Sequence, residues 1–106
     1  MRVLLFFDLP TYTSADMRAY RKFVKDLKTE GFYMLQESVY VKMALNQQVA
    51  DSVKKHIKSF MPNNGNIMIL CITEKQFSAM DIMLGENKTD VINDTNRMTL
   101  LWKSYL

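Results

Sequence analysis

Asp8 is the side chain of this sequence best placed to do chemistry. It follows the apolar run Val3–Phe7, which is typical of a strand buried on both faces. A carboxylate at the end of such a strand is an oxygen ligand suited to Mg²⁺ or Mn²⁺. A metal held there could lower the pKa of a bound water and offset charge on a phosphodiester under attack. The alternative is that Asp8 only caps the turn that follows it.

One carboxylate holds a divalent cation poorly, because such ions take several oxygen ligands. A two-fold dimer could bring a second Asp8 close to the first and so double the number of carboxylate oxygens. The metal hypothesis therefore depends on the chain pairing with a copy of itself.

Positive side chains gather on the first expected helix. Four of them follow the spacing i, i+3, i+4, i+7 and share one helical face: Arg18, Arg21, Lys22 and Lys25. Such a row suits contacts with the phosphates of a duplex. The alternative is a solvated helix surface, partly neutralised by Asp26 and Glu30.

The charge balance of the chain supports the phosphate hypothesis. Its net charge is +3, and residues 1–60 hold ten Lys and Arg against six Asp and Glu. Polyanions are therefore favoured as partners over acidic proteins or cations.

The remaining candidates are weaker. Ser38 and Tyr40 alternate with Lys42 on an expected strand and so share one side. Tyr40 could stack on a base or steer a phosphate, or its ring could simply pack with the hydroxyl outward. His56 has no evident partner, and Cys71 is expected to be a buried, inert thiol.

The residue counts exclude several kinds of site. With one Cys and one His, a zinc site built from four such ligands is excluded within one chain. The three Gly residues leave no glycine-rich phosphate loop. If the chain is an enzyme, it depends on a metal ion and few side chains.

The first helix should begin near Ser14, because Thr13 and Asp16 fit a capping box. Gly31 sits where a left-handed C-cap belongs. The segment Phe32–Met43 reads as two strands that reverse near Gln36–Ser38, and one long bent strand is the competing interpretation.

Asn46 can cap a second helix, and Ile67–Ile72 is a further apolar strand. The apolar face expected for this helix consists of Val49, Val53, Ile57 and Phe60. A short helix over Glu74–Met80 and a short strand over Ile82–Leu84 should follow.

The order β-α-β-β-α-β predicts an α+β, ferredoxin-like fold with both helices on one face of an antiparallel sheet. Residues 1–85 would form this domain. The helices leave the other apolar face uncovered, so we expect a sheet-to-sheet homodimer. Residues 86–106 would be a C-terminal extension whose strand, Met98–Trp102, joins the sheet of the partner. No apolar run has the length of a signal peptide or membrane span, and a cytoplasmic protein is expected.

Four segments in this order resemble the small CRISPR-associated protein of the adaptation module, above all members from type II systems. They are Phe7-Asp8-Leu9-Pro10-Thr11, Tyr20-Arg21-Lys22-Phe23, Gly31-Phe32 and Gln36-Glu37-Ser38-Val39-Tyr40. The resemblance covers residues 1 to about 85, with a looser match in the C-terminal strand. It implies a ferredoxin-like homodimer whose C-terminal strands join the partner's sheet.

The resemblance also implies a function in antiviral defence. Two dimers of the CRISPR integrase would flank one dimer of this chain on a short duplex of invader DNA, the protospacer. The complex would insert that DNA into the CRISPR array, and this chain would be its structural, DNA-backbone-binding subunit. Arg18, Arg21 and Lys22 fall in the region where relatives carry basic residues.

Some relatives are Mg²⁺-dependent endonucleases on RNA or DNA. By this resemblance Asp8 matches the metal-binding aspartate, Tyr40 an aromatic position near it, and Ser38 a neighbouring polar one. Met34 stands where some nuclease-active relatives have an arginine, which argues against nuclease activity. The alternatives are a free-standing metal-dependent endoribonuclease acting on single-stranded RNA, and a metabolite-binding regulatory domain.

Overall fold

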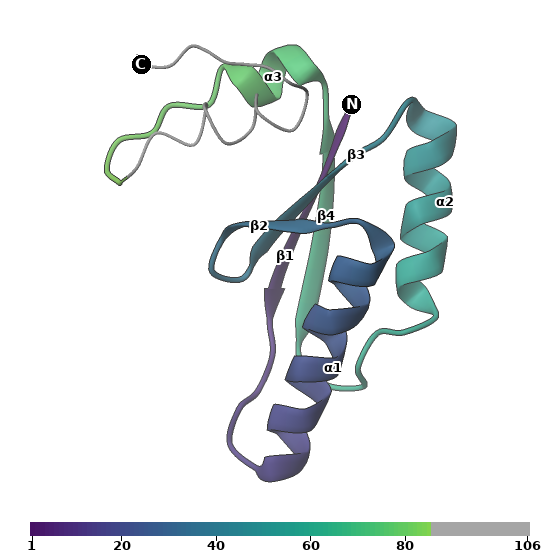
Figure 1. Cartoon of the computed structure of the whole chain (residues 1–106), viewed down its shortest axis with the longest axis vertical. Coiled ribbons are helices and arrows are strands. Elements are labelled where there is room, and N and C mark those ends of the chain that lie inside the picture. The colour runs from purple at the N-terminus through teal and green to yellow at the C-terminus, as the bar shows by residue number, and fades with distance from the viewer. Residues whose placement is uncertain (86–106) are drawn as a thin grey trace. The chain divides into compact units, whose positions relative to one another are not determined.

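The structure is a computed structural model of the chain and describes residues 1–85 (Figure 1). Its elements are β1 (Arg2–Asp8), α1 (Ser14–Glu30), β2 (Tyr33–Gln36), β3 (Val39–Met43), α2 (Gln47–Lys58), β4 (Asn66–Ile72) and α3 (Glu74–Ser78). Residues Met1–Glu74 form one compact unit. The predicted order β-α-β-β-α-β is confirmed.

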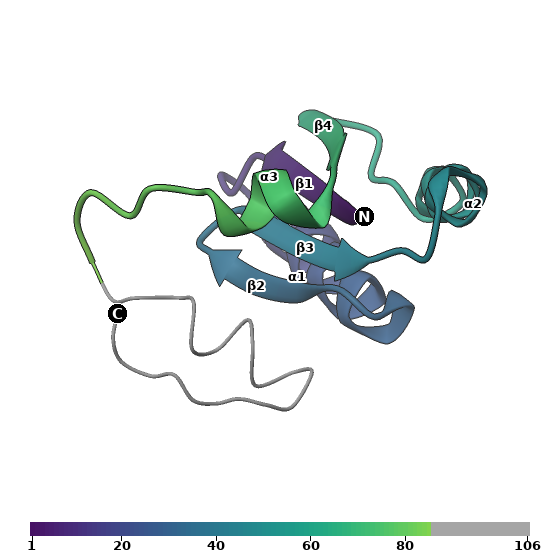
Figure 2. The ribbon, with the colours of Figure 1, turned by 90° about the horizontal axis from the view of Figure 1, so that it is seen from above.

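The four strands form one antiparallel sheet in the order β2-β3-β1-β4. The view from above in Figure 2 shows β1 between β3 and β4. In this register Leu5 lies opposite Tyr40 on β3 and Ile69 on β4. This strand order is that of the ferredoxin-like fold, which is thereby confirmed.

Local signals place both ends of α1. The hydroxyl of Thr13 accepts a hydrogen bond from the Asp16 N–H at 3.0 Å, and the Asp16 carboxylate accepts one from the Thr13 N–H at 3.2 Å. This reciprocal pair is the predicted capping box. At the other end Gly31 has a φ of 108°, the left-handed conformation that glycine adopts without steric cost.

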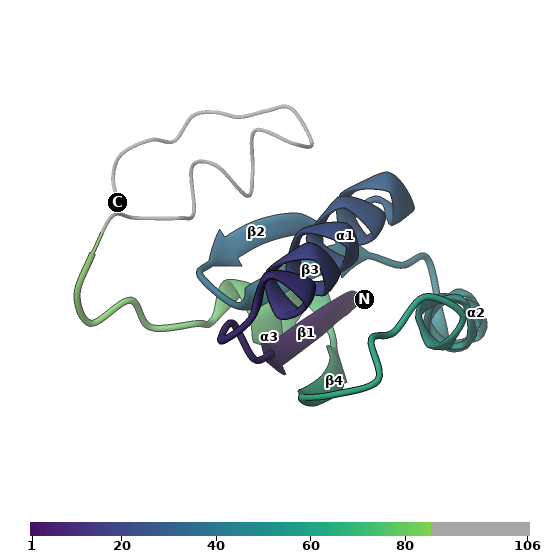
Figure 3. The same ribbon diagram turned by 90° about the horizontal axis from the view of Figure 1, so that it is seen from below.

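Both long helices pack on the same face of the sheet, as the view from below shows (Figure 3). The residues of β1 that point to them are Val3, Leu5 and Phe7. They form one buried cluster with Phe23 and Leu27 of α1 and Val53 and Ile57 of α2. The ring centroids of Phe7 and Phe23 lie 5.6 Å apart in an edge-to-face arrangement.

Val49 was expected on the buried face of α2, and that prediction is wrong. Asn46 does cap the helix, accepting the Val49 N–H at 2.9 Å. However, Val49 is 37% exposed, and the neighbouring Ala50 is fully buried in its place. Successive residues of a helix point about 100° apart. The face of α2 that meets the sheet therefore carries the small Ala50 and not the larger Val49.

The reversal near Gln36–Ser38 is confirmed, and one long bent strand is ruled out. Glu37 and Ser38 form the turn between β2 and β3. Ser38 has a φ of 67°, and its carbonyl accepts the Phe7 N–H at 3.1 Å. The turn is therefore fixed to the end of β1.

The opposite face of the sheet carries a second set of apolar side chains. Leu4 and Phe6 point to it from β1, and their partners on β4, Leu70 and Met68, are 52% and 65% exposed. β4 lies at an edge of the sheet. The expected apolar face away from α1 and α2 is thus present, but it is exposed mainly along β4, since Leu4 and its β3 partner Val41 are buried.

The expectations for the last part of the chain have mixed outcomes. The short helix is confirmed as α3, two residues shorter than predicted. The strand predicted over Ile82–Leu84 is wrong, because those residues form no strand. The extension 86–106, including Met98–Trp102, lies outside the described residues. Within residues 1–85, no helix combines the length and apolar character needed to cross a bilayer.

Candidate nucleic-acid interface

The basic row of α1, defined as Arg18, Arg21, Lys22 and Lys25, is exposed along its whole length. Only Lys22 has an acidic partner within residues 1–85, since its ammonium lies 2.7 Å from the Asp26 carboxylate. The other three make no ion pair there. Three cations are thus free to contact phosphates without first breaking an ion pair.

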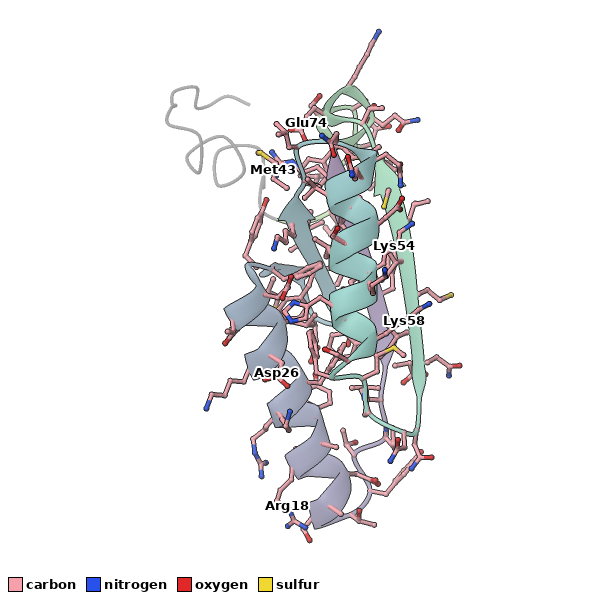
Figure 4. The ribbon with its side chains drawn as sticks, turned by 90° about the vertical axis from the view of Figure 1, so that its right-hand side faces the viewer. Arg18, Asp26, Met43, Lys54, Lys58 and Glu74 are labelled. Atoms are coloured by element: carbon pink, nitrogen blue, oxygen red, sulfur yellow. The ribbon has the colours of Figure 1, made fainter. Side chains whose placement is uncertain are left out.

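A second group of cations on α2 was missed in the sequence. Lys54, Lys55 and Lys58 lie on this helix, and Lys54 contacts Asp51 at 3.6 Å. Figure 4 shows the labelled Lys54 and Lys58 on α2, with Arg18 and Asp26 on α1 beside it. Lys58 follows Lys54 by four residues and Lys55 by three, and this spacing in the sequence indicates that it neighbours both on the helix surface. The helices together present an outer surface that is mainly basic.

Asp8 lies at the exposed end of β1, opposite Asn66 of β4. Gly65 makes this approach of the two strands possible. It has a φ of 109°, and a Cβ added to it would lie 2.8 Å from the Asp8 carbonyl oxygen and 2.6 Å from Leu9 Cδ2. Any larger residue at this position would displace the end of β1 that carries the carboxylate.

Asp8 and Tyr40 lie on opposite faces of the sheet. Tyr40 pairs with Leu5, which points to the helices. Side chains alternate along β1, so Asp8 points to the opposite face, together with Leu4 and Phe6. Tyr40 is buried, with its ring centroid 5.8 Å from that of Phe7. Burial raises the pKa of Tyr40, and the nearby Tyr20 raises it further.

Ser38 lies at the same end of the sheet as Asp8. Its backbone bonds to Phe7, the residue before Asp8. The structure therefore brings Ser38 and Asp8 to one end, and it places Tyr40 on the other side.

Within one copy of residues 1–85, Asp8 is a lone carboxylate and not part of a larger set of metal ligands. Those residues contain no group of three or more His, Cys, Asp and Glu side chains that could hold a metal ion. Asp8 has only the amide Asn66 opposite it. A divalent cation would need oxygens from a second copy or from the substrate.

The other end of β1 holds a buried cation. Arg2 is 2% exposed, and it donates hydrogen bonds to Glu74 at 2.7 Å and to the Tyr33 hydroxyl at 2.8 Å. Burial alone would lower the pKa of Arg2, but these partners outweigh it and the pKa is raised. The hydrogen bond from Arg2 lowers the pKa of Glu74.

His56 has a partner that the sequence did not reveal. Its Nδ1 contacts the carboxylate of Glu30, whose other oxygen lies 3.5 Å from the Lys42 ammonium. The Lys42 ammonium also donates to the Glu30 carbonyl. This cluster joins α1, β3 and α2, so His56 and Lys42 have structural contacts. Cys71, expected to be buried, is half-buried against the core.

Comparison with known proteins gives one consistent answer. Residues 1–80 match the family model described as CRISPR associated protein Cas2. The protein named "CRISPR-associated endoribonuclease Cas2" of Ligilactobacillus salivarius is 43% identical over 101 residues, covering 95% of this chain and 100% of its own. A protein of the same name from Streptococcus mutans is 42% identical over 105 residues, covering 99% of this chain and 96% of its own.

A solved structure shows the same fold. The crystal structure of Streptococcus pyogenes Cas2 at pH 6.5 matches with a TM-score of 0.60 and 21% identity. The match covers 80% of this chain and 100% of that chain.

Proposed function

This chain belongs to the Cas2 family of CRISPR-associated proteins, and from that premise we propose that it is the structural, DNA-backbone-binding subunit of a CRISPR spacer-integration complex. It would act in the cytoplasm as a homodimer between dimers of the CRISPR integrase. Its ligand would be the duplex protospacer, held by its phosphates.

The observation that carries this proposal is the basic row of α1. Arg18, Arg21 and Lys25 are exposed and have no acidic partner within residues 1–85. Their spacing aligns them along one side of a 17-residue helix. Contacts to phosphates read no base sequence, and a subunit that handles fragments of any invader needs that property.

Replacing Arg18, Arg21 and Lys25 together with Ala tests the basic row. We expect affinity for a short duplex to fall at least about tenfold at low salt, equally for different sequences. The dependence of log affinity on log salt should flatten by about 0.9 for each phosphate that the variant no longer neutralises. Fluorescence anisotropy titrations at several salt concentrations would measure both quantities.

The matched control removes the same charge from α2, by replacing Lys54, Lys55 and Lys58 with Ala. A smaller loss of affinity in this variant would locate the main DNA-binding surface on α1. An equal loss in both variants would show that net charge alone governs binding. Unchanged binding in the α1 variant would remove the row from the interface.

The second candidate function is a Mg²⁺- or Mn²⁺-dependent endonuclease, acting on RNA or DNA through Asp8. The names of the relatives and the exposed end of β1 favour it. The described residues of one copy do not complete a metal site. We therefore propose cleavage only for a dimer in which both copies of Asp8 contribute, with Ser38 as the polar neighbour. Tyr40, on the opposite face, is not assigned a part in it.

A further inference from the structure

A pocket of about 540 Å³ lies between α1 and β3, away from Asp8. Seven residues line it, all of α1 except the last: Tyr20, Arg21, Val24, Lys25, Lys28, Thr29 and Tyr40. This volume falls within the range of roughly 300–1,000 Å³ common to small-molecule sites.

The pocket carries three positive charges and no acidic side chain. Arg21, Lys25 and Lys28 follow the spacing i, i+4 and i+7, so they lie along one edge of it. All three are exposed, and none has an ion-pair partner among residues 1–85. Their neighbour Lys22, which does have such a partner, lies outside the pocket. The lining therefore favours an anion with more than one negative charge.

Tyr40 supplies a second, independent sign of a ligand. The residue is 4% exposed, it lines the pocket, and it makes no side-chain hydrogen bond to any residue from 1 to 85. Buried hydroxyl groups nearly always have a hydrogen-bond partner. A tyrosine hydroxyl is protonated at neutral pH, so this phenol is a donor that lacks an acceptor within the described residues.

The aromatic contacts hold both tyrosines in position. The Phe7 ring lies 5.6 Å from Tyr20 and 5.8 Å from Tyr40, by centroids. Tyr20 and Val24 add apolar surface beside the cations. The pocket thus combines a preformed apolar wall, a hydroxyl donor and three cations.

We propose that this pocket binds a nucleotide through its terminal phosphate, a phosphate monoester held by Arg21, Lys25, Lys28 and the Tyr40 hydroxyl. A monoester carries nearly two negative charges at neutral pH and three strong acceptor oxygens, which match these donors. The base would lie against Tyr20 and Val24, since rings stack on aromatic faces without regard to sequence. The ligand is a free nucleotide or the phosphorylated end of a single strand.

This site shares Arg21 and Lys25 with the basic row, but its test does not need a duplex. The probe is adenosine 5′-monophosphate, titrated at low salt by two-dimensional NMR of the whole protein. We expect saturable shifts at Tyr20, Val24 and Tyr40, and no saturable binding of adenosine. If the monophosphate does not bind while the duplex does, the ligand proposed for this pocket is wrong and the proposed function is unaffected.

Tyr40→Phe removes the hydroxyl and keeps the ring. We expect it to weaken binding of the monophosphate about tenfold, the usual effect of losing a hydrogen bond to a charged group. Changing Arg21, Lys25 and Lys28 to Ala should weaken it more than tenfold. The α2 variant with Lys54, Lys55 and Lys58 changed to Ala is the matched control and should bind normally.

A dinucleotide with a 5′-phosphate distinguishes the two sources of the ligand. If this dinucleotide competes with the monophosphate, the pocket accepts the phosphorylated end of a strand. If it does not compete, the ligand is a free nucleotide. Both results support a site for a terminal phosphate. Equal competition by the unphosphorylated dinucleotide would overturn that selectivity. The proposed binding at this pocket would be wrong if the monophosphate showed no saturable binding. It would also be wrong if the Tyr40 variant and the two triple variants bound the monophosphate with the affinity of the wild type.

Discussion

At the scale of single residues, Asp8 and Tyr40 are separated by the alternation of side chains along β1 and β3. Leu5 pairs with Tyr40 on the face covered by the helices, and Asp8 belongs to the other parity. The cleavage proposed for Asp8 and the ligand binding proposed for Tyr40 therefore depend on different faces of the sheet, and we expect a substitution at either residue to leave the other activity intact.

Asp8→Ala should abolish metal-dependent cleavage of RNA or DNA while leaving duplex binding and spacer integration intact. Asp8 is exposed, so the free energy of unfolding should change by less than about 0.5 kcal/mol. Gel assays of cleavage and integration with the purified proteins would measure both activities.

Asp51→Ala, which removes an exposed carboxylate from α2, is the control for the change in charge. It should cleave as the wild type does. Loss of integration in the Asp8 variant would mean that this carboxylate is central to integration and that the structural role assigned to the chain is wrong.

The position of Asp8 could be predicted from the sequence because an apolar run of five residues stops there. Its relation to Tyr40 could not, since the face on which a strand residue lies depends on register between strands. The turn at Glu37 and Ser38 contains no Gly or Pro to fix that register. Ser38 instead adopts a φ of 67°, which sequence patterns rarely reveal.

At the scale of secondary structure, the ends of α1 were predictable and the orientation of α2 was not. Thr13, Asp16 and Gly31 act through local hydrogen bonds and backbone conformation, which nearby residues determine. Which face of α2 is buried depends on how closely it approaches the sheet. That distance favours Ala50 over Val49 and is a property of tertiary packing.

The network of Arg2, Tyr33 and Glu74 links β1, β2 and the first residue of α3. The pKa of Glu74 is lowered in the folded chain, chiefly by the hydrogen bond from Arg2. Its stabilising effect is therefore complete above the ordinary glutamate pKa of about 4.5 and is lost as the pH falls through the lower, folded-state pKa.

Glu74→Gln should reduce the free energy of unfolding at about pH 6 and have less effect at about pH 3. The difference should be on the order of 1 kcal/mol or less, because the Glu74 side chain is 50% exposed. Urea denaturation at a series of pH values would measure it. A difference that is constant across this pH range would show that the carboxylate charge is not what stabilises the network.

At the scale of the whole molecule, the apolar face away from α1 and α2 favours association with a second copy. Met68 and Leu70 lie on this face and are 65% and 52% exposed on an edge strand. Exposed apolar side chains on a sheet edge promote pairing with another chain. A second sheet of the same kind would cover them and bring two copies of Asp8 into one particle.

Replacing both Met68 and Leu70 with Lys should convert a dimer into a monomer, because charged side chains would then be buried in the interface. Sedimentation velocity at micromolar concentration would show the change in mass. Leu45→Lys, at a residue that is 86% exposed outside the sheet, is the control and should remain dimeric. A dimer that persists in the double variant would place the interface elsewhere.

The two ends of β1 bear opposite charges, and only one of them is tied into the fold. Arg2 is buried with named partners, whereas Asp8 is exposed and no hydrogen bond or ion pair involves its side chain within residues 1–85. Substitutions at position 8 should therefore change the free energy of unfolding very little. The proposed cleavage chemistry could therefore be lost by a single substitution at position 8, and regained as easily, at little cost in folding free energy.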